Sequence, residues 1–336
     1  MPAREQPPGP QYPHAETGPP PADAPVALSI VIVSWNVAAL LADCLDSLSR
    51  QTDAPPWEAV VVDNASPDDT VAMLQQRYPW VRLIANRQNR GFAGANNQGI
   101  AAARGRFVLL LNPDTIVSAG ALHKLVDFLS THPQVAIVGP NLRQPNGQPD
   151  RGSARRSYSL AAALWLDALR LGVTPLLGRI LRRRLAAPYD YNVTQPVEAV
   201  SGAAMLARRE LLQDLGGFAE VFLHCGEDID LCFRVRAQGL EIWYLAEAVI
   251  VHLGGRSTKK AVVRTAVNAA LSNAQFFRRC HGRGQALAFR LIVQCVQMPC
   301  LLGIGLVKLL ARREHTADLV RRCQIARALI AWRPVR

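Results

Sequence analysis

The chain has 336 residues, of which 49% are hydrophobic, and a net charge of +12 at pH 7. This length fits one large domain with appendages, or two domains, and it is ample for a sizeable buried core. The composition is that of a globular protein, which excludes a chain that is disordered throughout.

The first 26 residues differ from the rest. Nine prolines fall within the first 25 positions without any apolar periodicity, which predicts a disordered tail. The tail lacks the apolar stretch of about 7 to 15 residues that a secretory signal needs. The seven cysteines form no CxxC pair and are odd in number, so we expect reduced thiols and a cytoplasmic protein.

The first half of the chain alternates apolar, β-branched runs with helical patterns. Strands are predicted at 28–35, 57–66, 81–86, 106–112 and 135–139, with helices between them and at 118–132. Such alternation predicts an α/β fold, a mostly parallel sheet with helices on both faces.

The segment 141–196 interrupts this pattern with turn residues and arginines, so we interpret it as an insertion over one face. The α/β pattern resumes over 197–211. A helix is predicted at 226–239 and one or two strands at 240–255.

The positive charge is concentrated in the C-terminal region, predicted to be helical. Residues 255–336 contain 16 Lys or Arg and two acids, a net charge of +14, which leaves −2 for the remainder. Residues 291–307 are 17 uncharged residues between basic ones, short for a spanning helix of about 20 residues. We expect a helix at an anionic membrane surface, with a buried helix or an oligomer contact as the alternative.

Polar residues follow three neighbouring strands where ligands bind in α/β sheets, outside the carboxyl ends. The first strand ends at Ser34 and Asn36, the second at Asp63, and the fourth at Asn112 and Asp114. These endings predict one site. Trp35 and Trp243 could stack on a base or sugar, although core packing is the more common role.

The stretch NRGFAGANNQG (89–99) is predicted to be a glycine-rich loop that runs into a helix. Gly91, Gly94 and Gly99 would allow close backbone approach, and Arg90 offers a charge for a phosphate. The stretch does not match GxGxxG, and the chain has no GxxxxGK[ST] loop, which argues against a dehydrogenase.

Seven segments in order carry a family resemblance: IVIVSWN, VVVDNAS, NRGFAGANNQG, LLLNPDT, GAAMLARRE, GEDIDLCFR and VHLGG. Together they resemble family 2 glycosyltransferases of the GT-A fold, particularly the rhamnosyltransferase-like subgroup, over residues 27–260. The resemblance implies inverting transfer of a sugar, rhamnose in that subgroup, from a nucleotide diphosphate donor in cell-surface polysaccharide synthesis.

The resemblance also implies roles for individual residues. Asp228 would be the general base, with Glu227 beside it, and Asp230 would be structural. Asp114 and His252 would bind a divalent cation, Mg²⁺ or Mn²⁺. The nucleotide sugar would contact Ser34, Asn36, Asp63, Arg90, Gly91, Asn97, Asn112, Asp114 and Arg256, and the acceptor would face Gly202 and Ala203.

Asn112 departs from the family pattern, since it replaces the first acid of the DxD element. One carboxylate and the donor phosphates are still sufficient ligands for Mg²⁺. Without the family resemblance, the acidic pair Glu227 and Asp228 would be interpreted as favourable capping of a helix N-terminus.

We therefore expect a nucleotide diphosphate sugar as donor and a saccharide or lipid-linked acceptor, at the inner membrane face. Two alternatives remain open: a non-catalytic sugar-nucleotide or polyanion-binding protein, and a nucleotidyltransferase. No aromatic-interleaved basic motif predicts nucleic acid as a partner, and no feature predicts an oligomeric state.

Overall fold

The computed structural model describes residues 26–156, 159–160, 189–222, 225–254, 262–310 and 316–332. The predicted tail lies almost entirely outside the described residues, as does the middle of the predicted insertion. The first residues of that insertion, up to Arg143, continue a strand that begins at Val135.

The predicted α/β fold is confirmed: a nine-stranded, mostly parallel sheet forms the centre of the described chain. Its strand order is β3-β2-β1-β4-β10-β6-β11-β5, and β8 also pairs with β11. In chain order the strands are β1 (Leu28–Ser34), β2 (Trp57–Asp63), β3 (Arg82–Ala85), β4 (Phe107–Leu111), β5 (Thr115–Val117), β6 (Val135–Arg143), β7 (Ala154–Arg155), β8 (Gln195–Pro196), β9 (Ala199–Val200), β10 (Ala204–Arg208) and β11 (Glu241–His252).

β1 to β4 are parallel to one another, and β6 is parallel to β11. β10 lies antiparallel between β4 and β6, and β5 pairs antiparallel with β11. Outside the main sheet, β7 and β9 form a two-stranded pair.

Helices cover both faces of the sheet, because the central strands are apolar on both sides. In β1, Ile30 and Ile32 pack into one core and Val31 into the other. The described helices of this part are α1 (Ala38–Ser49), α2 (Thr70–Arg77), α3 (Gly91–Ala102), α4 (Ala121–Thr131), α7 (Arg209–Asp214) and α8 (Glu227–Ala237). The first core includes residues of α1, α2 and α4, and the second includes residues of α3, α7 and α8.

The helix in the glycine-rich stretch begins earlier than predicted, so most of the expected loop is helical. α3 already begins at Gly91, so Gly94 and Gly99 lie within a helix. A side chain on Gly99 would collide with Val31 of β1. The absence of a side chain there permits close packing of helix on sheet, and it does not expose backbone N–H groups to an anion.

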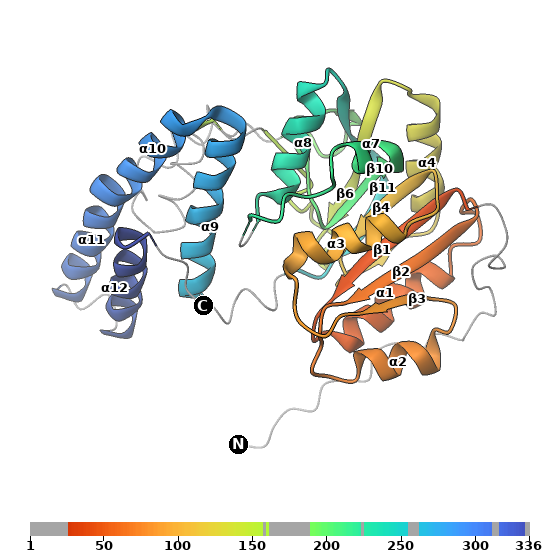
Figure 1. Cartoon of the computed structure of the whole chain (residues 1–336), viewed down its shortest axis with the longest axis horizontal. Helices are drawn as coiled ribbons and strands as arrows, with labels where there is room; N and C mark the ends of the chain where they lie inside the picture. The colour runs from red at the N-terminus through yellow and green to blue at the C-terminus, as the bar shows by residue number, and fades with distance from the viewer. Residues whose placement is uncertain are drawn as a thin grey trace.

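A group of C-terminal helices packs beside α8 (Figure 1). It consists of α9 (Val262–Phe276), η2 (Phe277–His281), α10 (Arg283–Ile292), η3 (Val293–Gln297), α11 (Met298–Leu310) and α12 (Thr316–Ile330), where η marks π-helical turns. Their buried side chains, among them Phe276, Phe277 and Leu329, continue the core that contains Leu231 of α8. The predicted C-terminal helical region is therefore confirmed.

Candidate active site

Two buried polar atoms at the carboxyl ends of β1 and β2 have no partner among the described residues. They are the Ser34 Oγ and the Asp63 Oδ1. Ser34 and Asp63 are paired in the parallel register, so the two side chains come from neighbouring strand ends. Buried polar groups are nearly always hydrogen-bonded, so an unpartnered pair indicates a position where a polar ligand binds.

Asn64, directly after β2, organises the entry to α3. Its side-chain nitrogen donates to Asn89 Oδ1 at 3.0 Å and to the Gly91 carbonyl at 3.1 Å. Its side-chain oxygen accepts from the Arg90 backbone N–H at 2.8 Å. These bonds fix the start of the helix, where the exposed Arg90 lies.

Two predicted nucleotide contacts have different surroundings. Asn36 has a left-handed backbone, φ 56°, and its N–H donates to Ser66 Oγ at 2.9 Å. The Asn97 amide bonds to the backbone N–H and carbonyl of Phe218 and to the Glu220 carboxylate. Asn97 thus holds the segment before α8, and its contact with a nucleotide stays a prediction.

The expectation of core packing is wrong for Trp35, whose side chain is 51% exposed at the end of β1. Its neighbours Ser34 and Asn36 belong to the candidate site, so its indole is available to a ligand there. Trp243 is partly buried and packs against Phe128, with 5.5 Å between ring centroids.

Asp114 and His252 come together at the far end of the same edge. The antiparallel pairing of β5 with β11 puts Thr115 opposite His252, and Asp114 Oδ1 lies 3.4 Å from His252 Nε2. On its other nitrogen, His252 Nδ1 lies 3.2 Å from Asp150 Oδ2. Burial opposes protonation of the imidazole, but the hydrogen bonds and charges of Asp114 and Asp150 outweigh it and raise the pKa of His252 to about 9.

The same contact also shifts the pKa of Asp150. The hydrogen bond to His252 is the main reason that the pKa of Asp150 lies below its ordinary value. Among the described residues, no group of three or more His, Cys, Asp or Glu side chains is arranged to hold a metal ion. A cation at Asp114 and His252 would therefore need ligands from its substrate.

Asp228 lies in the first turn of α8, which begins after Gly226 in a left-handed conformation, φ 107°. Asp228 is 5% exposed. Asp228 Oδ2 accepts from Arg155 Nη2 at 3.1 Å and from the Gly202 N–H at 3.0 Å, and Oδ1 accepts from the Ile229 N–H at 2.9 Å. These donors hold the carboxylate in one orientation.

Glu227 precedes Asp228 and is partly buried. Burial disfavours its charged form, and the negative charge of Asp228 adds to this effect, so the pKa of Glu227 lies well above its ordinary value. The two adjacent carboxyls are thus in different electrostatic environments.

The segment 150–155 connects the two groups of acids. Asp150 contacts His252, and its Oδ1 accepts from the Gly152 N–H at 2.9 Å. The Gly152 carbonyl accepts from Arg155 Nε at 3.0 Å, and Arg155 reaches Asp228. We call residues 150–155 the bridging segment.

Sequence reasoning missed Asp150 and Arg155. Both fall in the predicted insertion, where turn residues and many arginines look like a surface. The one available signal was an acid and an arginine flanking a glycine, which is too common to be specific.

Gly202 and Ala203 lie between Asp228 and the end of β4. Gly202 donates its N–H to Asp228, and the Ala203 carbonyl accepts from the Asn112 N–H at 2.8 Å. A side chain on Gly202 would be 3.3 Å from the Asp228 Cβ, which is tight. The structure therefore brings Asn112, Gly202 and Asp228 together. Arg256 lies outside the described residues.

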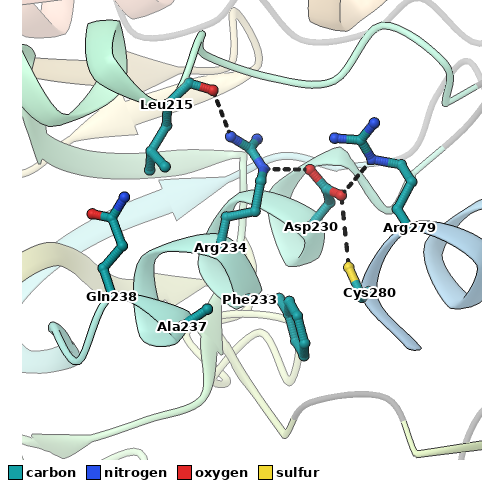
Figure 2. Close-up of a pocket in the computed structure, with 8 residues that line it drawn as sticks. All are labelled: Leu215, Asp230, Phe233, Arg234, Ala237, Gln238, Arg279 and Cys280. Carbon is teal, nitrogen blue, oxygen red and sulfur yellow. Dashed lines mark hydrogen bonds and ion pairs between the residues drawn. The ribbon is translucent and has the colours of Figure 1, made fainter. Parts of the chain in front are cut away.

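Asp230 is fully buried and faces away from this edge, toward the C-terminal helices (Figure 2). It accepts from Arg234 Nε at 2.8 Å and from Arg279 Nε of η2 at 2.9 Å. Arg234 also donates to the backbone carbonyls of Leu215 and Gly217. These contacts are structural, as expected for Asp230.

Comparison with known proteins decides the family. The model of "Glycosyl transferase family 2" matches residues 29–216, more than half of the chain. The chain belongs to glycosyltransferase family 2.

This glycosyltransferase is 30% identical to the N-acetylglucosaminyl-diphospho-decaprenol L-rhamnosyltransferase of Mycobacterium tuberculosis (strain ATCC 25618 / H37Rv), over 69% of this chain and 77% of the relative. It is also 30% identical to the O-antigen biosynthesis protein RfbC of Myxococcus xanthus, over 67% of this chain but only 17% of that longer protein. The predicted rhamnosyltransferase-like resemblance is confirmed.

A solved structure with the same fold is mannosyltransferase PcManGT from Pyrobaculum calidifontis, in complex with GDP-Man and Mn²⁺. The TM-score is 0.55 at 18% identity, covering 94% of this chain and 90% of that chain. This glycosyltransferase therefore has the GT-A fold. Its membership of family 2 sets aside the non-catalytic and nucleotidyltransferase alternatives.

Proposed function

We propose that this glycosyltransferase moves a sugar, rhamnose by likeness to its mycobacterial relative, from a nucleotide diphosphate donor to a saccharide or lipid-linked acceptor in cell-surface polysaccharide synthesis. The names of the two relatives, a rhamnosyltransferase acting on a lipid diphosphate and an O-antigen biosynthesis protein, support this substrate class.

One observation carries the proposal. The bridging segment joins Asp228 to the Asp114 and His252 pair, so a candidate base and two candidate cation ligands belong to one hydrogen-bonded unit. Sugar transfer needs a base at the acceptor hydroxyl and charge neutralisation at the leaving diphosphate. The unpartnered Ser34 Oγ and Asp63 Oδ1 support a donor nucleotide at the neighbouring strand ends.

Asp228 is proposed to take the acceptor proton on its Oδ1. A carboxylate oxygen has about two acceptor positions. Oδ2 uses both, for Arg155 and Gly202, whereas Oδ1 accepts only from Ile229 among the described residues. The acceptor oxygen would then attack the anomeric carbon as the bond to the diphosphate breaks, which inverts that carbon.

A divalent cation, Mg²⁺ or Mn²⁺, would offset the charge that develops on the departing diphosphate. The donor set fits if the cation displaces the proton from His252 Nε2: Asp114 would offer a carboxylate and the neutral His252 an imidazole nitrogen. Asp150 on the other ring nitrogen would orient the ligating histidine. Arg90 and Arg256 are further candidates for contact with the phosphates.

In this proposal residues 27–260 form the catalytic unit, and residues 261–336 hold the enzyme at the cytoplasmic face of the inner membrane. In the described part of the chain one helix, Arg283–Gly303, is long and apolar enough to cross a membrane, with a mean hydropathy of 1.5.

A donor screen tests the proposal. Nucleotide diphosphate release is measured from a panel of sugar nucleotides, with and without Mg²⁺ or Mn²⁺, using the purified chain and its Asp228→Asn variant. We expect cation-dependent release from one donor in the unchanged chain only. Release from no donor with any saccharide or lipid-linked acceptor, or equal release by both proteins, would contradict the proposal.

A further inference from the structure

The helical run from Arg283 through Leu310, which comprises α10, η3 and α11, has two different long faces. One face is buried against the other C-terminal helices and includes Phe289, Val293, Met298 and Leu301. The opposite face is exposed, and we call it the outer face. Its exposed uncharged residues are Leu287, Leu291, Cys295, Val296, Pro299, Cys300, Gly303 and Leu306.

The outer face exposes several large apolar side chains to solvent. Leu287, Leu291, Val296 and Leu306 are about half exposed, at 55%, 48%, 53% and 52%. Large apolar side chains gathered on one helix face indicate an interaction site, whereas scattered ones do not. In Figure 1, α10 and α11 lie at the edge of the molecule farthest from the sheet.

Basic residues border this face. Arg283 and Arg290 are exposed on α10, and Lys308 follows the apolar stretch in sequence. Residues 255–336 carry a net charge of +14, as counted above. An apolar helix face with basic borders fits a surface that is apolar inside and anionic outside, which describes an anionic bilayer.

We propose that the outer face docks on an anionic membrane, with its apolar side chains in the interfacial layer, Arg283 and Arg290 near the lipid phosphates, and the helix parallel to the bilayer. This inference rests on the proposed function only for the location at the inner membrane. It adds which surface of the C-terminal helices contacts the membrane.

The buried face argues against a spanning helix. Gln294 donates to the carbonyls of Leu329 and Ile330 at 3.1 and 2.9 Å, which ties η3 to the end of α12. α12 itself exposes Arg321, Gln324 and Arg327. Insertion of the Arg283–Leu310 run would either strip it from α12 or pull these polar side chains into hydrocarbon, which is costly.

Charge argues against a second copy of the chain as the occupant. Two copies joined through their outer faces would bring together two regions that each carry +14. Like charges at close range oppose association, whereas anionic lipid headgroups neutralise them.

A groove at one end of the outer face also fits lipid. It has a volume of about 440 Å³ and is lined by apolar side chains together with Gln275, Arg278 and Arg290. Arg290 lies over the Trp332 ring, 5.3 Å from its centroid. Val221, from the segment before α8, also lines the groove, so the groove lies between that segment and the C-terminal helices.

Vesicle binding tests the proposal with three full-length proteins: the unchanged chain, a triple variant Leu291→Gln, Val296→Gln and Leu306→Gln, and a control Val193→Gln. Val193 is also 51% exposed but lies far from α10 and α11 in sequence, beside the main sheet. All substituted side chains are exposed, so folding should be unchanged, which circular dichroism checks.

Cosedimentation is measured with phosphatidylglycerol–phosphatidylcholine vesicles and with phosphatidylcholine vesicles. We expect the unchanged chain and the control to bind the anionic vesicles, and the triple variant to bind at least about tenfold more weakly, equivalent to about 1.4 kcal/mol. Raising NaCl to 1 M should weaken binding of all three, because the Debye length falls to about 3 Å.

Three results would overturn the proposal. They are equal binding of the triple variant, a lipid-free dimer that becomes a monomer in the triple variant, and resistance of the membrane-bound chain to alkaline carbonate, which marks a spanning helix. Sugar transfer to a soluble acceptor is measured in parallel. If transfer is absent from all three proteins while the binding pattern holds, the proposed function fails and the membrane face stands.

Discussion

At the scale of single residues, the two adjacent carboxyls at the start of α8 have different environments. Asp228 is held by three donors, among them the Arg155 guanidinium, whereas Glu227 has a pKa raised by burial and by the charge of its neighbour. A proton acceptor must be ionised before the reaction, and the ion pair with Arg155 makes Asp228 the better candidate.

Replacing each carboxyl tests this assignment. We expect Asp228→Asn to reduce the rate of transfer about 10² to 10⁴-fold, the usual contribution of a general base, while donor affinity changes little. Glu227→Gln should keep most of the rate, because burial and the charge of Asp228 already favour the neutral form of Glu227, which glutamine mimics. Initial rates and donor binding by calorimetry measure both, and the reverse ranking of the two variants would reassign the base.

Arg155 is expected to position Asp228 without touching substrate. Loss of its guanidinium in Arg155→Ala should lower kcat about 10-fold or more and leave the KM for donor nearly unchanged, because a misplaced base costs rate more than binding. Arg151→Ala, an exposed arginine four residues earlier, is the matched control and should be neutral. A rise in donor KM with unchanged kcat would instead place Arg155 in donor binding.

At the scale of elements, close contacts between helix and sheet hold the strand ends in register. α3 packs on β1 through Gly99, and the segment before β4 is joined to β1 and β2 through Ser29 and Glu58. These contacts lie beneath the site or at the opposite edge of the sheet, so they affect stability and leave the chemistry unchanged.

Gly99→Ala should destabilise the fold by about 1–3 kcal/mol, because the new methyl group would overlap Val31 in a well-packed core. Gly284→Ala, in α10 with open space around it, is the control and should be neutral or stabilise by up to about 1 kcal/mol through helix propensity. Urea unfolding measures both, and equal effects would show that α3 can shift away from β1 without cost.

Glu58 gives a pH-dependent contribution to stability. Burial raises its pKa, but hydrogen bonds from Ser29 and Arg104 outweigh burial and lower the pKa below the ordinary value of 4.5. The unfolded chain therefore binds the proton more readily than the folded one, so the stabilisation is present above about pH 4.5 and is lost as the pH falls further.

Glu58→Gln should accordingly lower the free energy of unfolding by about 1.5–3 kcal/mol at pH 7, the range for hydrogen bonds to charged groups. The difference from the unchanged chain should shrink toward pH 3. Glu210→Gln, at an exposed position, serves as the control. A difference that is constant from pH 7 to pH 3 would exclude the charged form as its source.

At the scale of the whole molecule, Asp230 joins the glycosyltransferase fold to the C-terminal helices (Figure 2). Its carboxylate is completely buried and pairs with arginines from both parts. This ion-pair cluster therefore helps to fix the orientation of the C-terminal helices relative to the candidate active site.

Asp230→Ala should cost about 3–5 kcal/mol, because it leaves the partly buried Arg234 guanidinium without its counter-charge and also breaks the pair with the more exposed Arg279. Arg236→Ala breaks a more exposed pair with Glu198, 3.6 Å apart, and should cost less than about 1 kcal/mol. Thermal unfolding compares the two variants, and similar losses would mean that the buried cluster is replaceable by water.

The sequence by itself determined the α/β fold and most of the candidate strand-end residues. Alternating apolar and helical segments dictate a parallel sheet, and parallel strands present their carboxyl ends at one edge. That is why Ser34, Asp63 and Asp114 were predicted at one edge. The sequence-based prediction failed for the glycines of α3, because a glycine required by helix packing cannot be distinguished in sequence from one required by a phosphate-binding loop.

Only the tertiary structure decided which groups touch. Arg155 reaches Asp228 across 73 positions and Asp150 reaches His252 across 102. These contacts depend on the antiparallel placement of β5 and β10, which no local pattern encodes, because β-pairing partners are chosen by the packing of the entire sheet. The composition of residues 291–307 was sufficient to predict an apolar helix. Which face of that helix is exposed depends on its packing against α9 and α12.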